Sequence, residues 1–334
     1  MFRRPRGNYR NIPPRKAGSS GPPPIVPIRF ADLFPGAYQV VQTDLGLSYG
    51  AVMRADAGNT SSVAFALTGA TPAVPVPIWI RITAPGVGNV YYDGLGVTPA
   101  MVGVTIVDSV NIVLTGAGAG MAITPGVGSQ VVGNTWRATC SGLADQSGNG
   151  FNTIQLTPAQ QPIVTVGLNG KPGLLFDGVD DVFVSNIATL AQPYQIVLVG
   201  RLLDPSIGNK ALCGGGPGGF NSGLLYTNSG SLIFSYSGGF GPSLPFTSSA
   251  NTRFACTYTG TTADTLLVGS ASATGANGGA TTGPNVALGA NVPLSQYGNC
   301  EIFAAIYTPP VPSLAAFDTA LNTPAGYGPG AIAI

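Results

Sequence analysis

The feature that most constrains the fold of this chain is its shortage of the charged residues that build exposed helix faces. Among 334 residues there are three lysines, no histidine and one glutamate, Glu301. Helices usually carry Glu, Lys, Ala and Leu, with charged pairs four residues apart. The chain instead places Val, Ile, Thr, Tyr and Phe in short runs between clusters rich in its 49 glycines and 29 prolines. This pattern is typical of short strands and turns, and it predicts an all-β protein.

Length and composition predict a folded body of about two domains at roughly 150 residues each. A hydrophobic content of 44% supplies enough apolar surface to offset the chain entropy that keeps polar sequences disordered. No uninterrupted apolar run reaches the ~18 residues of a membrane span. The N-terminal residues lack the apolar stretch of a signal peptide, so we expect synthesis in a reducing cytosol.

The four cysteines, at positions 140, 213, 256 and 300, are widely spaced. No pair has the CxxC spacing of a zinc site. They are interpreted as buried thiols or as up to two disulfide bridges. A reducing cytosol disfavours bridges at synthesis, so both alternatives stay open.

Residues 1–30 form a basic, proline-rich segment that we expect to be an extended arm. PPPIVP favours a polyproline II conformation. After residue 30 the chain holds seven basic and thirteen acidic residues, a net charge of −6, so a basic arm precedes an acidic body. We expect the arm to dock on an acidic protein surface. A nucleic-acid contact is the less favoured alternative, because aromatic residues are sparse and no nucleic-acid-binding fold follows. The docking residues are Arg3, Arg4, Arg6, Arg10, Arg15 and Lys16.

Residues 31–135 are predicted to form a small β-sandwich. The runs SSVAFALTG, VPIWIRIT, GVTIV and VNIVLTG have strand length and end in Gly, Pro or Thr. Trp79 and Arg81 alternate with isoleucines at 78, 80 and 82, the period of a half-buried strand. No charge lies between Asp108 and Arg137, so we expect this stretch to be a covered strand pair or to contact another subunit.

Residues 136–334 are predicted to form a second β domain. Its candidate strands are PIVTVG, GLLF, VFVSN, YQIVLVGRL, GLLYT, SLIFSYS, FACTYTG, DTLLVGS and CEIFAAIYT. The segment 312–322 is predicted to be a helix, because Leu314, Phe317 and Leu321 share one face and Ser313 can cap its start.

This second region resembles the laminin-G/concanavalin-like jelly rolls of phage and bacterial surface proteins. The resemblance rests on four segments in family order: WRATCSGLADQSGNGFNTIQ, LNGKPGLLFDGVDDVFVSN, YQIVLVGRLL and NCEIFAAIYTPPVPSLAAFDTALN. It implies a two-sheet jelly roll, often a module that contacts carbohydrate or protein.

The middle region is similar, more weakly, to small β domains of tailed-phage virion proteins, through VPIWIRITAPGVGNV, GVTIVDSVNIVLTGAGAGM and GNTWRAT. Its YYDGLG stretch is shorter than the corresponding segment of that family.

The acidic run FDGVDD has three interpretations. Asp177-Gly178 between LLF and VFV is a hairpin signal, and turn chemistry is the favoured one. A calcium site is the second, with Asp177, Asp180 and Asp181 joined by Asp145 or Asn149. Catalysis is the least favoured. Without histidine there is no Ser-His-Asp arrangement, and jelly-roll glycosidases of the laminarinase type use two glutamates. A pair of aspartates can in principle cleave a glycoside, but no second motif supports that here.

Together these features predict a non-enzymatic structural protein on the exterior of a phage particle: a capsid decoration, a collar or a fibre-like appendage anchored through the arm. Expected partners are other virion proteins of the capsid, neck or tail, and copies of the chain itself, with a trimer favoured by analogy. No membrane partner is expected, and no cofactor other than the calcium alternative. The alternative function is recognition of a host glycan, with Tyr236, Phe240 and Tyr297 as candidate contacts near the loop 235–246.

Overall fold

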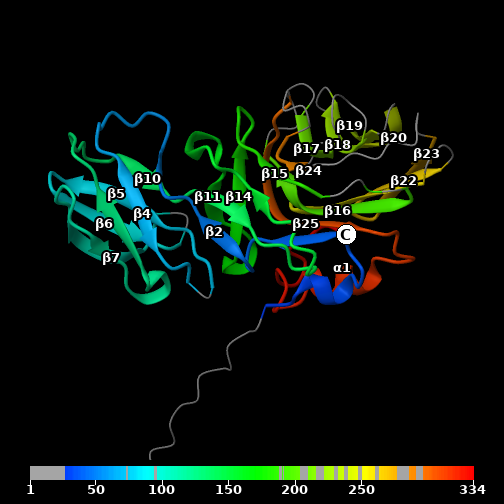
Figure 1. Cartoon of the computed structure of the whole chain (residues 1–334), viewed down its shortest axis with the longest axis horizontal. Coiled ribbons are helices and arrows are strands. Elements are labelled where there is room, and N and C mark those ends of the chain that lie inside the picture. The colour runs from blue at the N-terminus through cyan, green and yellow to red at the C-terminus, as the bar shows by residue number, and fades with distance from the viewer. Residues whose placement is uncertain are drawn as a thin grey trace, which may run out of the picture.

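A computed structural model describes residues 27–334 except for short gaps at 73, 94–95, 188–189, 191, 204–209, 216–221, 229–231, 237–239, 247–249, 260–262, 277–285 and 291–295. The side chains of 222–228 are likewise not described. The prediction of an all-β protein is confirmed: two β-sandwiches lie side by side, with one short α-helix beneath the larger (Figure 1). In the described part of the chain no helix is long and apolar enough to cross a membrane.

The larger sandwich consists of an eight-stranded and a nine-stranded antiparallel sheet. The first has the order β13 (Ile163–Val166), β14 (Pro172–Asp177), β25 (Asn299–Thr308), β16 (Tyr194–Leu202), β21 (Thr252–Tyr258), β22 (Asp264–Val268) and β23 (Ala271–Gly275), with β1 (Gln39–Gln42) also paired to β25. The second has the order β2 (Leu47–Tyr49), β11 (Cys140–Leu143), β12 (Thr153–Ile154), β15 (Phe183–Ser185), β24 (Val286–Leu288), β17 (Lys210–Gly215), β18 (Ser222–Asn228), β19 (Leu232–Tyr236) and β20 (Phe240–Pro245). This agrees with the predicted two-sheet jelly roll, and each of the nine runs predicted as strands contributes one.

Strands β16 and β25 are almost continuously apolar because their sheet is covered on both faces. The inner face packs on the second sheet through a core that includes Leu198, Phe254 and Ile302. The outer face is covered by two short helices, η1 (Phe30–Leu33) and α1 (Ala315–Leu321), where Phe30 and Phe317 meet edge to face at 4.9 Å.

The predicted helix is confirmed within 312–322. Leu314, Phe317 and Leu321 are buried. The N-cap residue is Leu314 and not the predicted Ser313, although the Ser313 hydroxyl accepts a hydrogen bond from the Ala315 amide at 3.1 Å. Three further short 3-10 helices lie in loops: η2 (Gly116–Gly118), η3 (Pro158–Gln160) and η4 (Leu168–Gly170).

The smaller sandwich packs a five-stranded sheet on a three-stranded one. The first has the order β3 (Arg54–Ala55), β10 (Thr135–Arg137), β5 (Trp79–Ala84), β6 (Val87–Tyr91) and β7 (Pro99–Thr105), and the second β4 (Phe65–Gly69), β9 (Met121–Pro125) and β8 (Ile112–Val113). The predicted alternation in β5 is confirmed, since Ile80 and Ile82 are buried while Arg81 is exposed.

The predicted boundaries of the two β regions need correction. Strand β1 pairs with β25 and β2 pairs with β11, so residues 31–49 belong to the larger sandwich. Trp136, expected to begin the jelly roll, packs on Phe65 inside the smaller core at 4.7 Å between ring centroids. The smaller sandwich is therefore inserted between β2 and β11. Sequence patterns missed this because β1 and its partner β25 lie at opposite ends of the chain.

Candidate functional site

The acidic run 177–181 is a corner between two sheets and not the predicted hairpin. It links β14 of one sheet to β15 of the other, and each strand pairs elsewhere. The predicted turn chemistry is present: Asp177 Oδ1 accepts a hydrogen bond from the Val179 amide at 2.8 Å. Gly178 has φ +77°, and a Cβ there would lie 2.9 Å from Asn299 Cβ.

An arginine from the smaller sandwich enters this corner. Arg54 of β3 donates two hydrogen bonds to Asp181, with Nη1–Oδ1 at 2.6 Å and Nη2–Oδ2 at 2.9 Å, and its Nη1 lies 3.6 Å from Asp177 Oδ2. The Asp181 side chain is fully buried. Burial raises the pKa of Asp181 to about 6, and the Arg54 guanidinium opposes this shift.

This arrangement bears on the calcium alternative. The carboxylate oxygens of Asp177, Asp180 and Asp181 lie within 4.8 Å of one another. The position of a cation among them is, however, taken by the Arg54 guanidinium. Asp145 is not part of this group.

Asp145 instead organises the Asp-Gln-Ser-Gly-Asn-Gly turn. Its carboxylate accepts hydrogen bonds from the amides of Ser147 at 2.9 Å, Phe151 at 3.1 Å and Val40 at 3.0 Å. Asn149 Nδ2 donates to the carbonyl of Tyr38 at 3.0 Å. Both side chains therefore hold the start of β1 against the larger sandwich.

Glu301 is engaged in an ion pair within its sheet. Arg201 Nε lies 2.6 Å from Glu301 Oε2, and the two residues are cross-strand neighbours on β16 and β25. Burial raises the pKa of Glu301, while Arg201 lowers it. The arrangement gives this glutamate a structural role within its sheet.

The predicted glycan contacts fall into two clusters. Phe240, exposed by 73%, packs on Tyr236 with ring centroids 5.6 Å apart. Tyr297 is partly buried against the separate cluster of Val182, Ala287 and Ala290. The glycan role of these residues stays a prediction. The docking-arm residues Arg3, Arg4, Arg6, Arg10, Arg15 and Lys16 lie outside the described residues.

Sequence reasoning missed a polar hollow of about 260 Å³ on the outer face of the five-stranded sheet. It is lined by Asp56, Trp79, Arg81, Tyr91, Gly96, Thr135 and Arg137. Strand register explains why they meet: Trp79 is opposite both Tyr91 and Arg137, and Arg81 is opposite Thr135. The signal in the sequence was the alternation of Trp79 and Arg81 with buried isoleucines, which places both side chains on the outer face of the strand.

Two of its side chains form a fixed platform. The Arg137 guanidinium lies over the Trp79 ring, 4.0 Å from the centroid. Asp56 holds the guanidinium in place through Nε–Oδ1 at 2.6 Å and Nη2–Oδ2 at 3.0 Å. Because Asp56 and Arg137 are each about one quarter exposed, this pair is accessible from the hollow.

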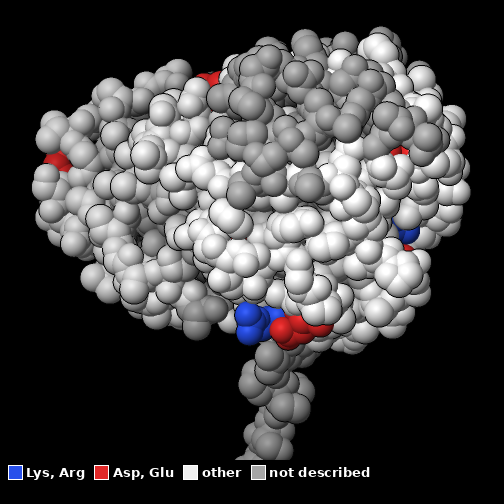
Figure 2. All heavy atoms as spheres, turned by 45° about the vertical axis from the view of Figure 1, so that its right-hand side comes forward, with Lys and Arg blue, Asp and Glu red and all other residues white. Residues whose placement is uncertain are grey.

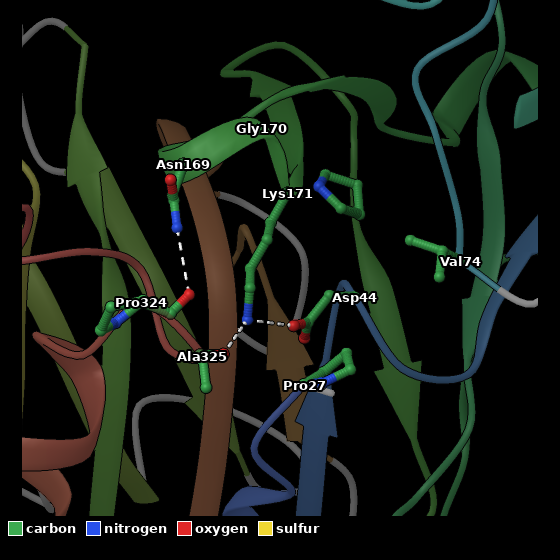
Figure 3. A pocket seen from close by; sticks show the side chains of 9 residues that line it. Pro27, Asp44, Val74, Asn169, Gly170, Lys171, Pro324 and Ala325 are labelled. Atoms are coloured by element: carbon green, nitrogen blue, oxygen red, sulfur yellow. Dashed lines mark hydrogen bonds and ion pairs between the residues drawn. The ribbon is translucent and has the colours of Figure 1, made fainter. Parts of the chain in front are cut away.

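A second hollow, of about 200 Å³, lies where the start of the described chain meets its C-terminal segment (Figure 3). Pro27, Val74 and Pro324 supply apolar walls. The Lys171 ammonium reaches Asp44 Oδ2 at 2.7 Å and donates to the Ala325 carbonyl at 2.6 Å. The lysine is thus engaged by the protein itself, and the hollow is a junction of chain segments.

All four cysteines are free and buried, which answers the question that the sequence left open. Burial raises the pKa of the Cys140 and Cys256 thiols to about 12. Such thiols are poor nucleophiles.

Comparisons with known proteins find structural likeness only. No protein-family model matches the chain, and no curated protein matches its sequence. An α-L-arabinofuranosidase soaked with 4-nitrophenyl α-L-arabinofuranoside aligns with a TM-score of 0.46 at 10% identity, over 87% of this chain and 63% of that one. A botulinum neurotoxin serotype D ligand-binding domain in complex with N-acetylneuraminic acid aligns with a TM-score of 0.42 at 11% identity, over 53% and 47%. The chain spans less than two thirds of the length of either protein.

Proposed function

We propose that this protein is a non-enzymatic structural component of the exterior of a phage particle, held by its basic arm and self-associated through one end of its smaller sandwich. The observation that carries the proposal is a group of exposed valines at that end. We call it the valine end, and it comprises Val107, Val110, Val127, Val131 and Val132, of which Val127 is 81% exposed.

Hydrogen bonds fix each valine-bearing loop to a neighbouring strand. The Ser109 amide donates to the Pro125 carbonyl at 2.8 Å, where the loop after β7 meets the end of β9. The Gly133 amide donates to the Ile82 carbonyl at 2.9 Å, which fixes the loop before β10 to β5. Monomeric soluble proteins rarely leave several large apolar side chains exposed in one place. The valine end therefore has the composition of a surface covered in an assembly.

A second copy of the chain is the partner that fits this surface. Across 106–134 the only charged residue is Asp108, so the valine end offers little for a charged partner to pair with. Charged side chains are also sparse on the face of the molecule drawn in Figure 2. Homo-oligomers of closed symmetry bury such patches between their subunits.

Three features support the non-enzymatic part of the proposal. Asp177 organises a turn, Asp181 is bound by Arg54, and Glu301 is bound by Arg201. In the described part of the chain these carboxylates act in turns and ion pairs.

Self-association is tested by measuring the mass of the full chain in solution, by light scattering across a concentration series. We expect a discrete oligomer that dissociates in the double variant Val127→Ser, Val132→Ser. Leu156→Ser is the matched control, because Leu156 is 83% exposed on the larger sandwich. A wild-type chain that stays monomeric at all concentrations would contradict the proposal.

The anchoring role is tested by deleting residues 1–26. We expect a folded body that no longer associates with particles, because the deletion removes six basic residues of the arm. Recovery of the truncated chain on purified particles at wild-type occupancy would contradict the anchoring role of the arm.

The second candidate function is recognition of a host glycan. It is favoured by the hollow over Trp79, which combines an aromatic ring with both hydrogen-bond donors and hydrogen-bond acceptors. Ligand sites typically join apolar surface to a few polar groups that fix orientation.

A further inference from the structure

We infer that the hollow over Trp79 binds a sugar that carries a carboxylate, such as a uronic or sialic acid residue, with Arg81 as the group that recognises the carboxylate. The inference rests on the glycan-recognition candidate and adds the chemical class of the ligand.

The charge balance of the hollow points to an anion. It contains two guanidinium groups, those of Arg81 and Arg137, and one carboxylate, that of Asp56. Asp56 neutralises Arg137 through two contacts. Arg81 is exposed and has no ion pair with any described residue, so the hollow keeps one uncompensated positive charge.

The other described cations of the body are engaged by the protein, and Lys210 donates a hydrogen bond to the Gly178 carbonyl at 3.1 Å. Arg54, Arg137, Lys171, Arg201 and Arg253 each form an ion pair. An arginine presents a planar set of donors that matches a carboxylate with two parallel hydrogen bonds. Its neighbour across the strands, Thr135, is neutral, so no adjacent acid competes for it in the sheet.

The remaining groups select a polyhydroxylated ligand over a simple acid. The Asp56 carboxylate has acceptor capacity beyond its two contacts with Arg137, which suits hydroxyl donors. The same carboxylate repels a ligand that carries several acidic groups. Arg137, held over the Trp79 ring by Asp56, gives the hollow a fixed floor. A sugar acid offers one carboxylate and several hydroxyls on a single ring, which matches this distribution.

The size of the hollow fits one sugar residue. Its volume of about 260 Å³ is slightly below the range of roughly 300–1,000 Å³ typical of pockets for drug-sized ligands. It lies on the outer face of the sheet, so a longer glycan can continue over the surface beyond the residue that is bound.

The test uses the full chain and two probes that differ only at one carbon: methyl β-D-glucuronide, with a carboxylate, and methyl β-D-glucoside, with a hydroxymethyl group. Binding is followed by saturation-transfer NMR and titration. We expect the glucuronide to bind more tightly, and Arg81→Gln to weaken it about tenfold or more, the size of a lost charge-assisted hydrogen bond. Arg29→Gln is the matched control, because Arg29 is also an exposed arginine without an ion pair among the described residues and is not part of the hollow.

The outcomes separate the inference from the function on which it rests. Equal binding of both probes, unchanged in Arg81→Gln, overturns the carboxylate assignment and leaves glycan recognition standing. A preference for the glucuronide that persists in Arg81→Gln overturns the assignment to this hollow. Binding of neither probe overturns both the inference and the glycan-recognition candidate. An unchanged melting temperature of Arg81→Gln shows that any loss of binding is not a loss of fold.

Discussion

Arg54 and Asp181 lie 127 positions apart in the sequence and form a doubly hydrogen-bonded ion pair between the two sandwiches. Arg54 places a positive charge among the carboxylates of the acidic corner, as a bound metal ion would. It is also a physical link between the inserted smaller sandwich and the body that carries it. A second link lies nearby, where the Tyr49 hydroxyl accepts a hydrogen bond from the Val76 amide at 2.8 Å.

Replacing Arg54 by methionine is expected to lower the free energy of unfolding by about 3 kcal/mol, since removing one partner leaves a buried carboxylate unpaired. Methionine keeps the apolar stem of the side chain and removes only the charged head. Urea denaturation measures the effect. Arg29→Gln serves as the control and is expected to change stability by less than about 0.5 kcal/mol, as for other exposed positions. An Arg54→Met variant as stable as the control would show that the pair contributes nothing.

The cost of Arg54→Met is expected to depend on pH. The pKa of Asp181 is about 6 in the folded protein, above its ordinary value of 3.8. Between these two pH values the folded state binds a proton that the unfolded state has lost. The contribution of this group to stability therefore falls as pH rises through about 6. Without Arg54 this pKa rises further. The difference in stability between wild type and variant is therefore largest at neutral pH and shrinks as pH falls toward 4. Denaturation series at several pH values check this, and Asp181→Asn should remove the pH dependence of the Arg54→Met effect.

Much of the fold could be predicted from local pattern. The strands of both sandwiches follow runs of Val, Ile, Phe and Tyr, and the alternation around Trp79 correctly gave the outer face of β5. Local pattern could not predict which strands pair when they are distant in the sequence. The run LLFDGVDDVFV has the local chemistry of a hairpin, but β14 finds its partner in β25 and β15 finds its partner in β24. Turn residues fix a local bend and leave open which strands then pair.

The candidate site could likewise be predicted only in part. Three aspartates in five residues favoured turn chemistry and left a calcium site as the alternative, but the cation found there is a guanidinium from a strand more than a hundred residues earlier. The hollow over Trp79 needs three strands in register, and no stretch of sequence contains all of its residues.

Calcium is expected to leave the melting temperature of the wild-type protein unchanged at millimolar concentration. The Arg54 guanidinium already lies 2.6 Å from Asp181 Oδ1 and 3.6 Å from Asp177 Oδ2, so an added divalent ion would have to displace it from these oxygens. In Arg54→Met the same three carboxylates lose that positive charge, and calcium should then raise the melting temperature. Thermal denaturation with calcium and with EDTA measures both. Stabilisation of the wild type by calcium would restore the calcium site as the better interpretation of the corner.

Asp145→Ala is expected to loosen the first strand of the larger sandwich. The Asp145 carboxylate accepts hydrogen bonds from Val40, Ser147 and Phe151, and only the bond from Val40 reaches outside the turn. Losing a charged acceptor of partly buried amides should lower the free energy of unfolding by about 2 kcal/mol.

Hydrogen exchange separates this effect from a general loss of stability, because the Val40 amide should lose protection before the amides at the centre of β16 do. Asp93→Ala is the matched control: Asp93 likewise accepts hydrogen bonds from loop amides, those of Gly96 at 2.8 Å and Val97 at 2.9 Å, but in the smaller sandwich. The control should leave exchange at Val40 unchanged. Equal loss of protection in both variants would mean that Asp145 acts only on overall stability and not as the anchor of β1.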